Sequence, residues 1–199
     1  LLGEGHSIRH LDLGGGLGVP YRGDNDIPPH PDEYGAMCKR VLGPLGLKLV
    51  LEPGRMFVGN AGILVTRVIY RKDTEARSFV IQDGAMNDLI RPTLYDAHHD
   101  IIPVEKAKAD GEHVEADVVG GICESGDFFA RQRRLPAFDA GDLMAIMTAG
   151  AYGAVQAGTY NSRPLVPEVL VKGDRFAVIR PRQSYEELIG LDRLAAWQE

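Results

Sequence analysis

The residues best suited to chemistry stand together at Glu52-Pro53-Gly54-Arg55, directly after the apolar run 49–51. Pro53 fixes its own φ and favours an extended Glu52, which would place the carboxylate at the end of a strand. Gly54 lets the main chain approach an anion closely, and Arg55 supplies a permanently charged, planar fork for phosphate or carboxylate. The combination predicts a site for an anionic ligand that contains nitrogen. The alternative is a turn that ends a strand with an ordinary salt bridge.

A second loop has a related composition. Residues 10–13 predict a short buried strand, and it leads into Gly14-Gly15-Gly16-Leu17-Gly18, whose amides can face phosphate without Cβ obstruction. The spacing matches neither a dinucleotide-binding fingerprint nor a P-loop, and a plain glycine turn is the alternative. Both loops follow strands and are separated by a helix expected from about Asp32 to Leu42. This order indicates neighbouring βα units of a barrel, with ligand groups at the carboxyl ends of the strands.

The sequence changes character near residue 60. Residues 1–60 predict the C-terminal segment of a barrel, with Cys38 in its core. Residues 61–199 are rich in β-branched and aromatic runs separated by Gly, Asp and Pro. They predict an antiparallel β-barrel or sandwich domain that ends in short helical structure between Tyr185 and Trp197. The expected strands are 63–70, 78–82, 113–119, 143–147, 168–171 and 176–179, the last two joined by a hairpin turn at 172–175.

Composition excludes several classes of function. The net charge of −6 disfavours nucleic acid as a main partner, and 44% hydrophobic with 25% charged residues is typical of a globular chain. No apolar run is long enough to span a membrane, and the start of the chain does not look like a signal peptide, so neither anchoring nor secretion is indicated. The chain has only two cysteines, for which a reducing cytoplasm is the simplest setting. Cys38 and Cys123 form no metal-ligand pattern. The adjacent pair His98-His99 does not share one helix face, so no metal site is predicted.

The ordered motifs resemble one family, the fold-type III pyridoxal-phosphate decarboxylases, and within it the branch that acts on diaminopimelate. They are 11–18, 52–55, 83–88, 91–95, 123–127, 150–153 and 160–164. The resemblance implies a TIM-type (β/α)8 barrel, of which this chain holds the C-terminal part, followed by the β-rich domain. The family's Schiff-base lysine lies in an N-terminal barrel strand, and no lysine here has a matching context. The chain therefore resembles the C-terminal half of an enzyme that is inactive without its N-terminal half.

The resemblance also implies roles for individual residues. Glu52 would lie beside the ring nitrogen of pyridoxal 5'-phosphate, and Cys123 would return a proton to the reacting carbon from the partner subunit of a homodimer with shared active sites. The cofactor-binding residues implied are Gly16, Glu52, Pro53, Gly54, Arg55 and Tyr152. The substrate-binding residues implied are Arg55, Arg91, Tyr95, Glu124 and Tyr152.

The distal end of the substrate distinguishes the possible activities. Arg91 with Tyr95 can bind a distal carboxylate through a guanidinium and a phenol, and Glu124 can bind a distal ammonium. These groups fit meso-2,6-diaminopimelate, whose decarboxylation to L-lysine is the expected reaction, the last step of lysine biosynthesis. An ordinary helix arginine beside a proline is the structural alternative for Arg91. The functional alternatives are a related ornithine, arginine or lysine decarboxylase, and a catalytically silent regulatory homologue.

Overall fold

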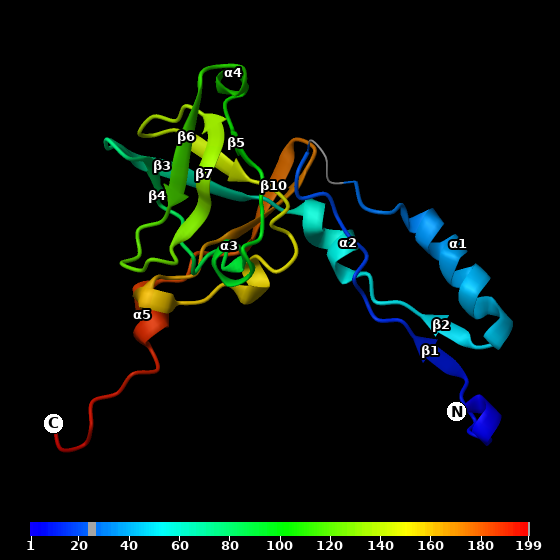
Figure 1. The fold of residues 1–199 in the computed structure, drawn as a ribbon. Helices are drawn as coiled ribbons and strands as arrows, with labels where there is room; N and C mark the ends of the chain where they lie inside the picture. Colours follow the sequence, from blue (N-terminus) through cyan, green and yellow to red (C-terminus); the bar gives the residue numbers. More distant parts are fainter. Residues whose placement is uncertain (24–26, 199) are drawn as a thin grey trace.

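The first part of the chain is a single β-α-β unit. The computed structural model describes residues 1–23 and 27–198. Strands β1 (His10–Asp12) and β2 (Lys48–Val50) pair in parallel, and helix α1 (Pro31–Leu42) lies between them in sequence. The unit extends to one side of the molecule (Figure 1), with short 3-10 helices at Leu2–Glu4 and Gly43–Leu45. The helix expected from Asp32 to Leu42 is confirmed.

Local chemistry explains where α1 begins and which residues it buries. His30 precedes the helix, and its Nδ1 accepts a hydrogen bond from the backbone amide of Asp32 at 3.3 Å. Pro31 occupies the first turn, where its missing N–H costs nothing. Cys38 is buried, as expected. Met37 and Val41 share its apolar stripe but remain exposed among the described residues, so the stripe is only partly covered.

The second part is a six-stranded sheet in the order β5-β8-β3-β4-β6-β7. Its strands are β3 (Leu64–Asp73), β4 (Ser78–Gln82), β5 (Ile101–Pro103), β6 (His113–Val119), β7 (Phe128–Pro136) and β8 (Leu143–Ile146). The expectation of an antiparallel sheet is wrong for one pair, because β4 and β6 run parallel and make the sheet mixed. The long connection between them, which includes β5 and the short helices α3 (Arg91–Tyr95) and α4 (Lys106–Ala109), permits this crossover.

The core of this sheet comes from the inward faces of its strands. On β3, Thr66 and Val68 are buried while their neighbours are exposed, which is the period of two of a half-buried strand. The core cluster is Val68, Val80, Leu89, Ile101, Ala116, Val118, Phe129, Ala130, Leu135, Phe138, Met144, Ile146 and Ala149. Leu89 and Ala149 lie in loops next to predicted site residues, so the core supports those loops directly.

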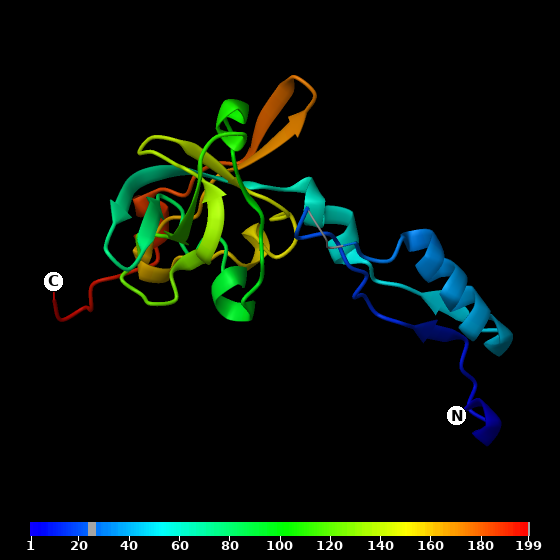
Figure 2. The ribbon, with the colours of Figure 1, turned by 45° about the horizontal axis from the view of Figure 1, so that its top comes forward.

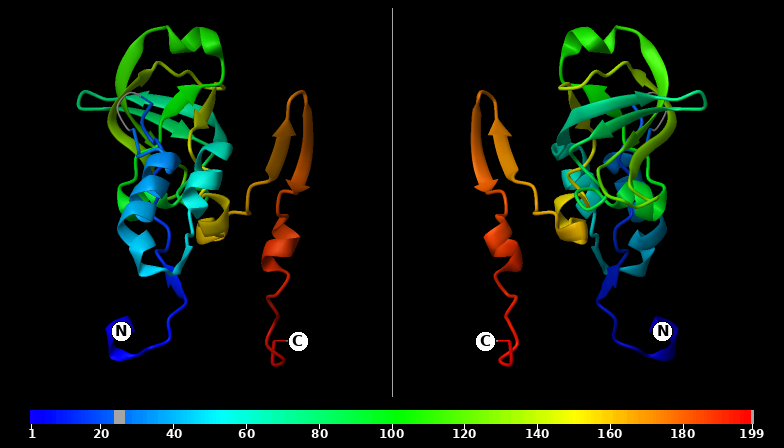
Figure 3. Two further views of the ribbon diagram at one scale, coloured as in Figure 1. Left: turned by 90° about the vertical axis from the view of Figure 1, so that its right-hand side faces the viewer. Right: turned by 90° about the vertical axis from the view of Figure 1, so that its left-hand side faces the viewer.

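A hairpin and a short helix follow the sheet. After 3-10 helices at Ala154–Gln156 and Tyr160–Ser162, strands β9 (Glu168–Lys172) and β10 (Arg175–Arg180) pair with each other, and α5 (Tyr185–Ile189) follows. Gly173 in the turn has φ of 62°, a conformation that favours glycine. The hairpin projects from the six-stranded sheet (Figures 2 and 3). Its apolar side chains, including Val171, Phe176 and Val178, are exposed.

The β-α-β unit joins the sheet through α2 (Gly54–Val58) and a 3-10 turn at Gly59–Ala61. Two backbone hydrogen bonds attach this connection to the loop after β8: the amide of Ala149 donates to the carbonyl of Gly62 at 2.8 Å, and the amide of Gly150 to that of Gly59 at 3.1 Å. A Cβ on Gly150 would lie 1.9 Å from the carbonyl oxygen of Val58. Only glycine permits this approach. In the described part of the chain, no helix has the length and apolar character needed to cross a bilayer.

Candidate active site

The two predicted ligand loops lie side by side at the ends of β1 and β2. The amide of Glu52 donates to the carbonyl of Gly14 at 2.8 Å, and a Cβ on Gly15 would lie 2.6 Å from the carbonyl oxygen of Glu52. Gly14 and Gly16 adopt φ of 67° and 91°, and the carboxylate of Asp12 accepts from the amide of Gly14 at 2.8 Å. The glycines are therefore needed both for the turn and for its contact with the second loop.

The paired loops offer groups of both charges to a ligand. Among the described residues, nothing accepts a hydrogen bond from the amides of Gly15 and Gly16. The carboxylate of Glu52 lies beside the same turn, because its Oε2 is 3.9 Å from the position of a Cβ on Gly14. Pro53 precedes α2, which begins at Gly54, and places the half-buried Arg55 in its first turn. Two amides, a guanidinium and a carboxylate suit an anion that carries a basic nitrogen.

The ring of Tyr21 connects these loops to the sheet. The guanidinium carbons of Arg55 and Arg91 lie over it, 6.0 Å and 4.7 Å from its centre. The same carbon of Arg91 lies 5.9 Å from the centre of the Tyr152 ring, and Tyr152 has φ of 60°. Three predicted site residues, Arg55, Arg91 and Tyr152, are thus brought together from three separate segments. We refer to Tyr21, Arg55, Arg91, His99 and Tyr152 as the arginine cluster.

Arg91 is a buried cation without a carboxylate partner among the described residues. Its exposed fraction is 8%, and no described acid lies within 4.0 Å of its guanidinium. Its Nη1 lies 3.1 Å from Nε2 of His99, which is fully buried. Burial lowers the pKa of His99 to about 4, with the nearby positive charge of Arg91 adding to the effect. The cluster is therefore a positive site that an anionic ligand would stabilise.

Cys123 and Glu124 lie in the loop between β6 and β7, and both are exposed. Asp127 holds this loop, because its buried carboxylate accepts from the amides of Met86 and Ile122, each at 2.7 Å. Burial raises the pKa of Asp127 even though these hydrogen bonds oppose the shift. The carboxylate of Asp127 therefore holds the conformation of this loop, and Cys123 and Glu124 are exposed at its outer edge.

Further contacts link this loop to α3. The hydroxyl of Thr93 donates to the carbonyl of Gly126, so the helix that begins with Arg91 also supports the loop of Cys123. Glu124 accepts from the amide of Gly126 at 3.2 Å and from the hydroxyl of Tyr160 at 3.3 Å. No described contact joins Cys123 or Glu124 to the arginine cluster. Tyr95, at the end of α3, is 60% exposed and also lies outside that cluster's contacts.

Arg163 ties together the remaining motif segments. Its Nε donates to Oδ1 of Asn87 at 2.9 Å, and its Nη2 donates to the carbonyl of Asp83 at 2.5 Å. The same nitrogen lies 3.7 Å from the carboxylate of Asp88, whose pKa is raised by burial. These contacts have a structural role, because they hold the loop before α3 in place.

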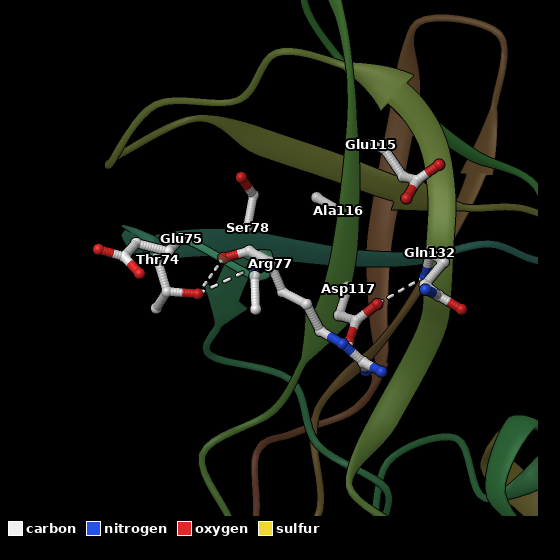
Figure 4. A pocket seen from close by; sticks show the side chains of 9 residues that line it. Thr74, Glu75, Arg77, Ser78, Glu115, Ala116, Asp117 and Gln132 are labelled. Atoms are coloured by element: carbon white, nitrogen blue, oxygen red, sulfur yellow. Dashed lines mark hydrogen bonds and ion pairs between the residues drawn. The ribbon is translucent and has the colours of Figure 1, made fainter.

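A polar hollow of about 230 Å³ lies elsewhere, between the β3–β4 turn and strands β6 and β7 (Figure 4). Asp117 is buried there; its carboxylate pairs with Arg77 at 3.1 Å and accepts from the amide of Gln132 at 2.5 Å. Gln132 has φ of 45°, next to an irregularity in the β6–β7 pairing. This hollow contains no predicted site residue, and its polar groups stabilise the bent strand.

Sequence reasoning missed two members of the arginine cluster. Tyr21 follows Pro20 after the glycine loop, and nothing in that local pattern distinguishes it from a loop tyrosine. In the sequence His99 stands out only as half of an adjacent pair, and the two members have different partners: His98 contacts Asp100 at 2.8 Å, and His99 contacts Arg91. A buried histidine eight residues after an arginine gives no sequence signal of their contact.

Comparison with known proteins identifies the family. Residues 20–150 match the model of the pyridoxal-dependent decarboxylase C-terminal sheet domain. Diaminopimelate decarboxylase of Zymomonas mobilis is 51% identical over 97% of this chain and 45% of that protein, and the Vibrio cholerae protein of the same name is 46% identical over 96% and 45%.

Solved structures agree. The crystal structure of diaminopimelate decarboxylase from Helicobacter pylori complexed with L-lysine has a TM-score of 0.85 and 39% identity, over 96% of this chain and 46% of that one. The chain spans about half the length of the relatives it matches. It belongs to the family of pyridoxal-dependent decarboxylases, whose C-terminal sheet domain it contains.

Proposed function

We propose that the complete protein is a carboxy-lyase that converts meso-2,6-diaminopimelate to L-lysine with pyridoxal 5'-phosphate as cofactor. Relatives at about half identity carry the name of this activity, which supports the proposal. The arginine cluster supports it independently, since it places the buried guanidinium of Arg91 and the half-buried one of Arg55 next to the paired loops.

The paired loops fit the proposed cofactor. When bound, pyridoxal phosphate delocalises the electron pair that a departing carboxylate leaves behind. Glu52 would hold the ring nitrogen protonated, and the amides of the glycine turn at Gly16 would bind the phosphate together with Gly54 and Arg55. Pro53 would end the extended segment after β2 just before α2 begins, and so leave these groups accessible to the cofactor. The unused amides of Gly15 and Gly16, within the described residues, are the observation that favours a phosphate here.

One observation carries the choice of substrate: the guanidinium of Arg91 is buried without a carboxylate partner in the described part of the chain. An uncompensated buried charge is costly, and a bound carboxylate would neutralise it. Diaminopimelate has a carboxylate at its distal end, whereas the distal end of lysine or ornithine carries only an amine. Tyr152, over which Arg91 lies, would contact cofactor and substrate, and Tyr95 would add a phenol to the distal carboxylate.

The loop of Cys123 would serve the other reacting groups. Glu124, held by the amide of Gly126 and the hydroxyl of Tyr160, would bind the distal ammonium. The exposed thiol of Cys123 would donate a proton to the substrate carbon. We propose that it acts in the site of the partner subunit of a homodimer, and the exposed position of its thiol fits this role.

The β-α-β unit is proposed to be the C-terminal part of a TIM-type barrel whose other units lie in the rest of the protein. The partly uncovered apolar stripe of α1 favours this, because Met37 and Val41 would be covered by a neighbouring barrel helix. The Schiff-base lysine is proposed to lie in that other part. This chain alone is then inactive, and the two parts together form the enzyme.

The test is carbon dioxide release by the complete protein with meso-diaminopimelate, L-lysine, L-ornithine or L-arginine. Only diaminopimelate should be turned over. Arg91→Ala should lower kcat/KM for it about 30- to 800-fold, as expected from the loss of about 2 to 4 kcal/mol of charge-assisted binding. Arg71→Ala is the control, because Arg71 pairs with Asp73 on strand β3. Turnover of the other amino acids alone would favour a related decarboxylase, and no turnover at all would favour a silent homologue.

A further inference from the structure

Both ring nitrogens of His99 are engaged, and their partners differ in kind. Nδ1 lies 2.8 Å from the carbonyl oxygen of Met147, in the loop after β8. Nε2 lies 3.1 Å from Nη1 of Arg91, at the start of α3. The ring packs on that of Tyr21 in a T-shaped arrangement, with the ring centres 5.4 Å apart and the planes at 83°. The imidazole therefore touches three segments of the molecule.

These partners define one protonation state. A carbonyl oxygen only accepts hydrogen bonds, and a guanidinium only donates them. The proton of the neutral ring must therefore be on Nδ1, and the lone pair on Nε2 must accept from Arg91. A second proton would have to reside on Nε2 and would face the N–H group of a permanent cation.

We propose that His99 is the positioning residue for Arg91, and that its neutral imidazole holds the guanidinium in the orientation that receives the distal carboxylate of the substrate. This inference rests on the proposed function of Arg91. The hydrogen bond to His99 fixes one end of the guanidinium, and its central carbon lies over the ring of Tyr21, 4.7 Å from the ring centre. The remaining N–H groups of Arg91 are thereby directed without a competing acid among the described residues.

The cations around His99 oppose its protonation, whereas the carbonyl oxygen of Met147 favours it. Arg91 faces it from α3, Arg133 of β7 donates from Nη1 to its carbonyl oxygen, His98 precedes it, and Tyr21 packs on its ring. Burial, the largest cause, together with Arg91, His98 and Arg133, lowers the pKa of His99 to about 4. His99 thus remains an acceptor for Arg91 throughout the neutral range.

A matched pair of amide variants of the complete enzyme tests the proposal. His99→Gln places an amide oxygen near the position of the histidine Nε2 and keeps an acceptor for Arg91. The side chain in His99→Asn is one methylene shorter than that of glutamine, so it keeps a donor for Met147 but loses the acceptor for Arg91. Inhibition is measured with L-lysine, which retains the distal carboxylate, and with cadaverine, which lacks it.

His99→Asn should weaken inhibition by L-lysine about tenfold or more, the size expected for one lost hydrogen bond to a charged group. Inhibition by cadaverine should change less than about threefold, and His99→Gln should restore most of the affinity for L-lysine. In an Arg91→Ala background, His99→Asn should have no further effect on L-lysine, since His99 acts through Arg91.

Three outcomes would overturn the proposal while leaving the proposed function intact. In the first, the unaltered enzyme turns over diaminopimelate, but His99→Asn weakens inhibition by L-lysine and by cadaverine to the same extent. In the second, His99→Asn weakens inhibition by L-lysine as much in the Arg91→Ala background as in the enzyme that has Arg91. The third needs no variant: nitrogen NMR of the unaltered enzyme at pH 7 should show His99 protonated on Nδ1 alone, and an imidazolium or the opposite tautomer would refute the inference. Lack of wild-type turnover would instead refute the proposed function.

Discussion

Gly150→Ala is expected to detach the β-α-β unit from the sheet. The added methyl would lie 1.9 Å from the carbonyl oxygen of Val58, 2.8 Å from the amide nitrogen of Gly62 and 3.1 Å from the carbonyl oxygen of Gly59. All three are backbone atoms, so no rotamer change can relieve the overlap. The chain must move, and the connection through α2 must separate from the loop after β8.

The cost has two parts. Inserting a methyl group into a packed site typically costs about 1 to 3 kcal/mol. Separation also breaks the hydrogen bonds from Ala149 to Gly62 and from Gly150 to Gly59, each with a net contribution of about 0.5 to 1.5 kcal/mol. We expect a local destabilisation of about 2 to 6 kcal/mol, together with a loss of activity, because Arg55 and Tyr152 lie on opposite sides of this contact.

Hydrogen exchange of the Ala149 amide in the complete protein measures this cost. The expected destabilisation corresponds to exchange at least about 30-fold faster than in the wild type. Gly158→Ala is the control, since nothing lies within 4 Å of the position of its Cβ. Equal exchange and equal activity in the two variants would refute the reasoning that the close approach at Gly150 holds the site together.

Three further predictions concern the buried acid, the exposed thiol and the buried imidazole. Asp127→Asn keeps only one of the two acceptor oxygens, so it should lower the free energy of local opening by about 1.5 to 3 kcal/mol. Hydrogen exchange of the Met86 and Ile122 amides should then be at least about tenfold faster. Unchanged protection of these amides would show that Asp127 does not hold the loop. Cys123→Ala should slow product formation by about two to four decades with little change in stability. Mixing it with subunits that lack the Schiff-base lysine should restore about one quarter of the activity, and no recovery in proven heterodimers would exclude a shared site. Because the pKa of His99 is about 4 in the folded protein and about 6.5 when unfolded, only the unfolded chain takes up this proton between those values. The free energy of unfolding should therefore fall by up to about 3 kcal/mol as pH decreases from 6.5 to 4, and urea titrations of His99→Gln should show a smaller fall.

The elements that sequence predicted well are those with local signals. Strands 78–82 and 113–119 match β4 and β6, because β-branched runs between turn residues specify a strand without reference to the rest of the fold. Strand β7 was missed, because Arg131, Gln132, Arg133 and Arg134 interrupt its apolar pattern. Distant partners stabilise these polar residues: Asp117 binds the amide of Gln132, and the carbonyl of His99 accepts from Arg133. The parallel pairing of β4 with β6 likewise depends on a crossover that no local pattern encodes.

The candidate site shows the same division. Gly14–Gly16 and Glu52–Arg55 were identifiable because glycine conformation and charge act within a few residues. Tyr21 lies 70 residues before Arg91, and their contact exists only because the β-α-β unit packs on the sheet through Gly59, Gly62 and Gly150. The contacts at Arg55, Arg91 and Tyr152 bring predicted site residues together, but the roles of all the predicted site residues stay predictions, as does the division of the chain at residue 60.

The projecting hairpin of β9 and β10 has a consequence for the lifetime of the protein in a cell. An isolated two-stranded hairpin is marginally stable in water. The exposed side chains of Val171, Phe176 and Val178 add no stabilisation from burial. Its turn lies between Lys172 and Arg175, which are cleavage sites for trypsin-like proteases. While no other surface covers it, such a hairpin would open readily and would offer proteases a cutting site. Assembly would then protect the chain from proteolysis. The cellular amount of the protein would depend on how much of the surface that covers the hairpin is present.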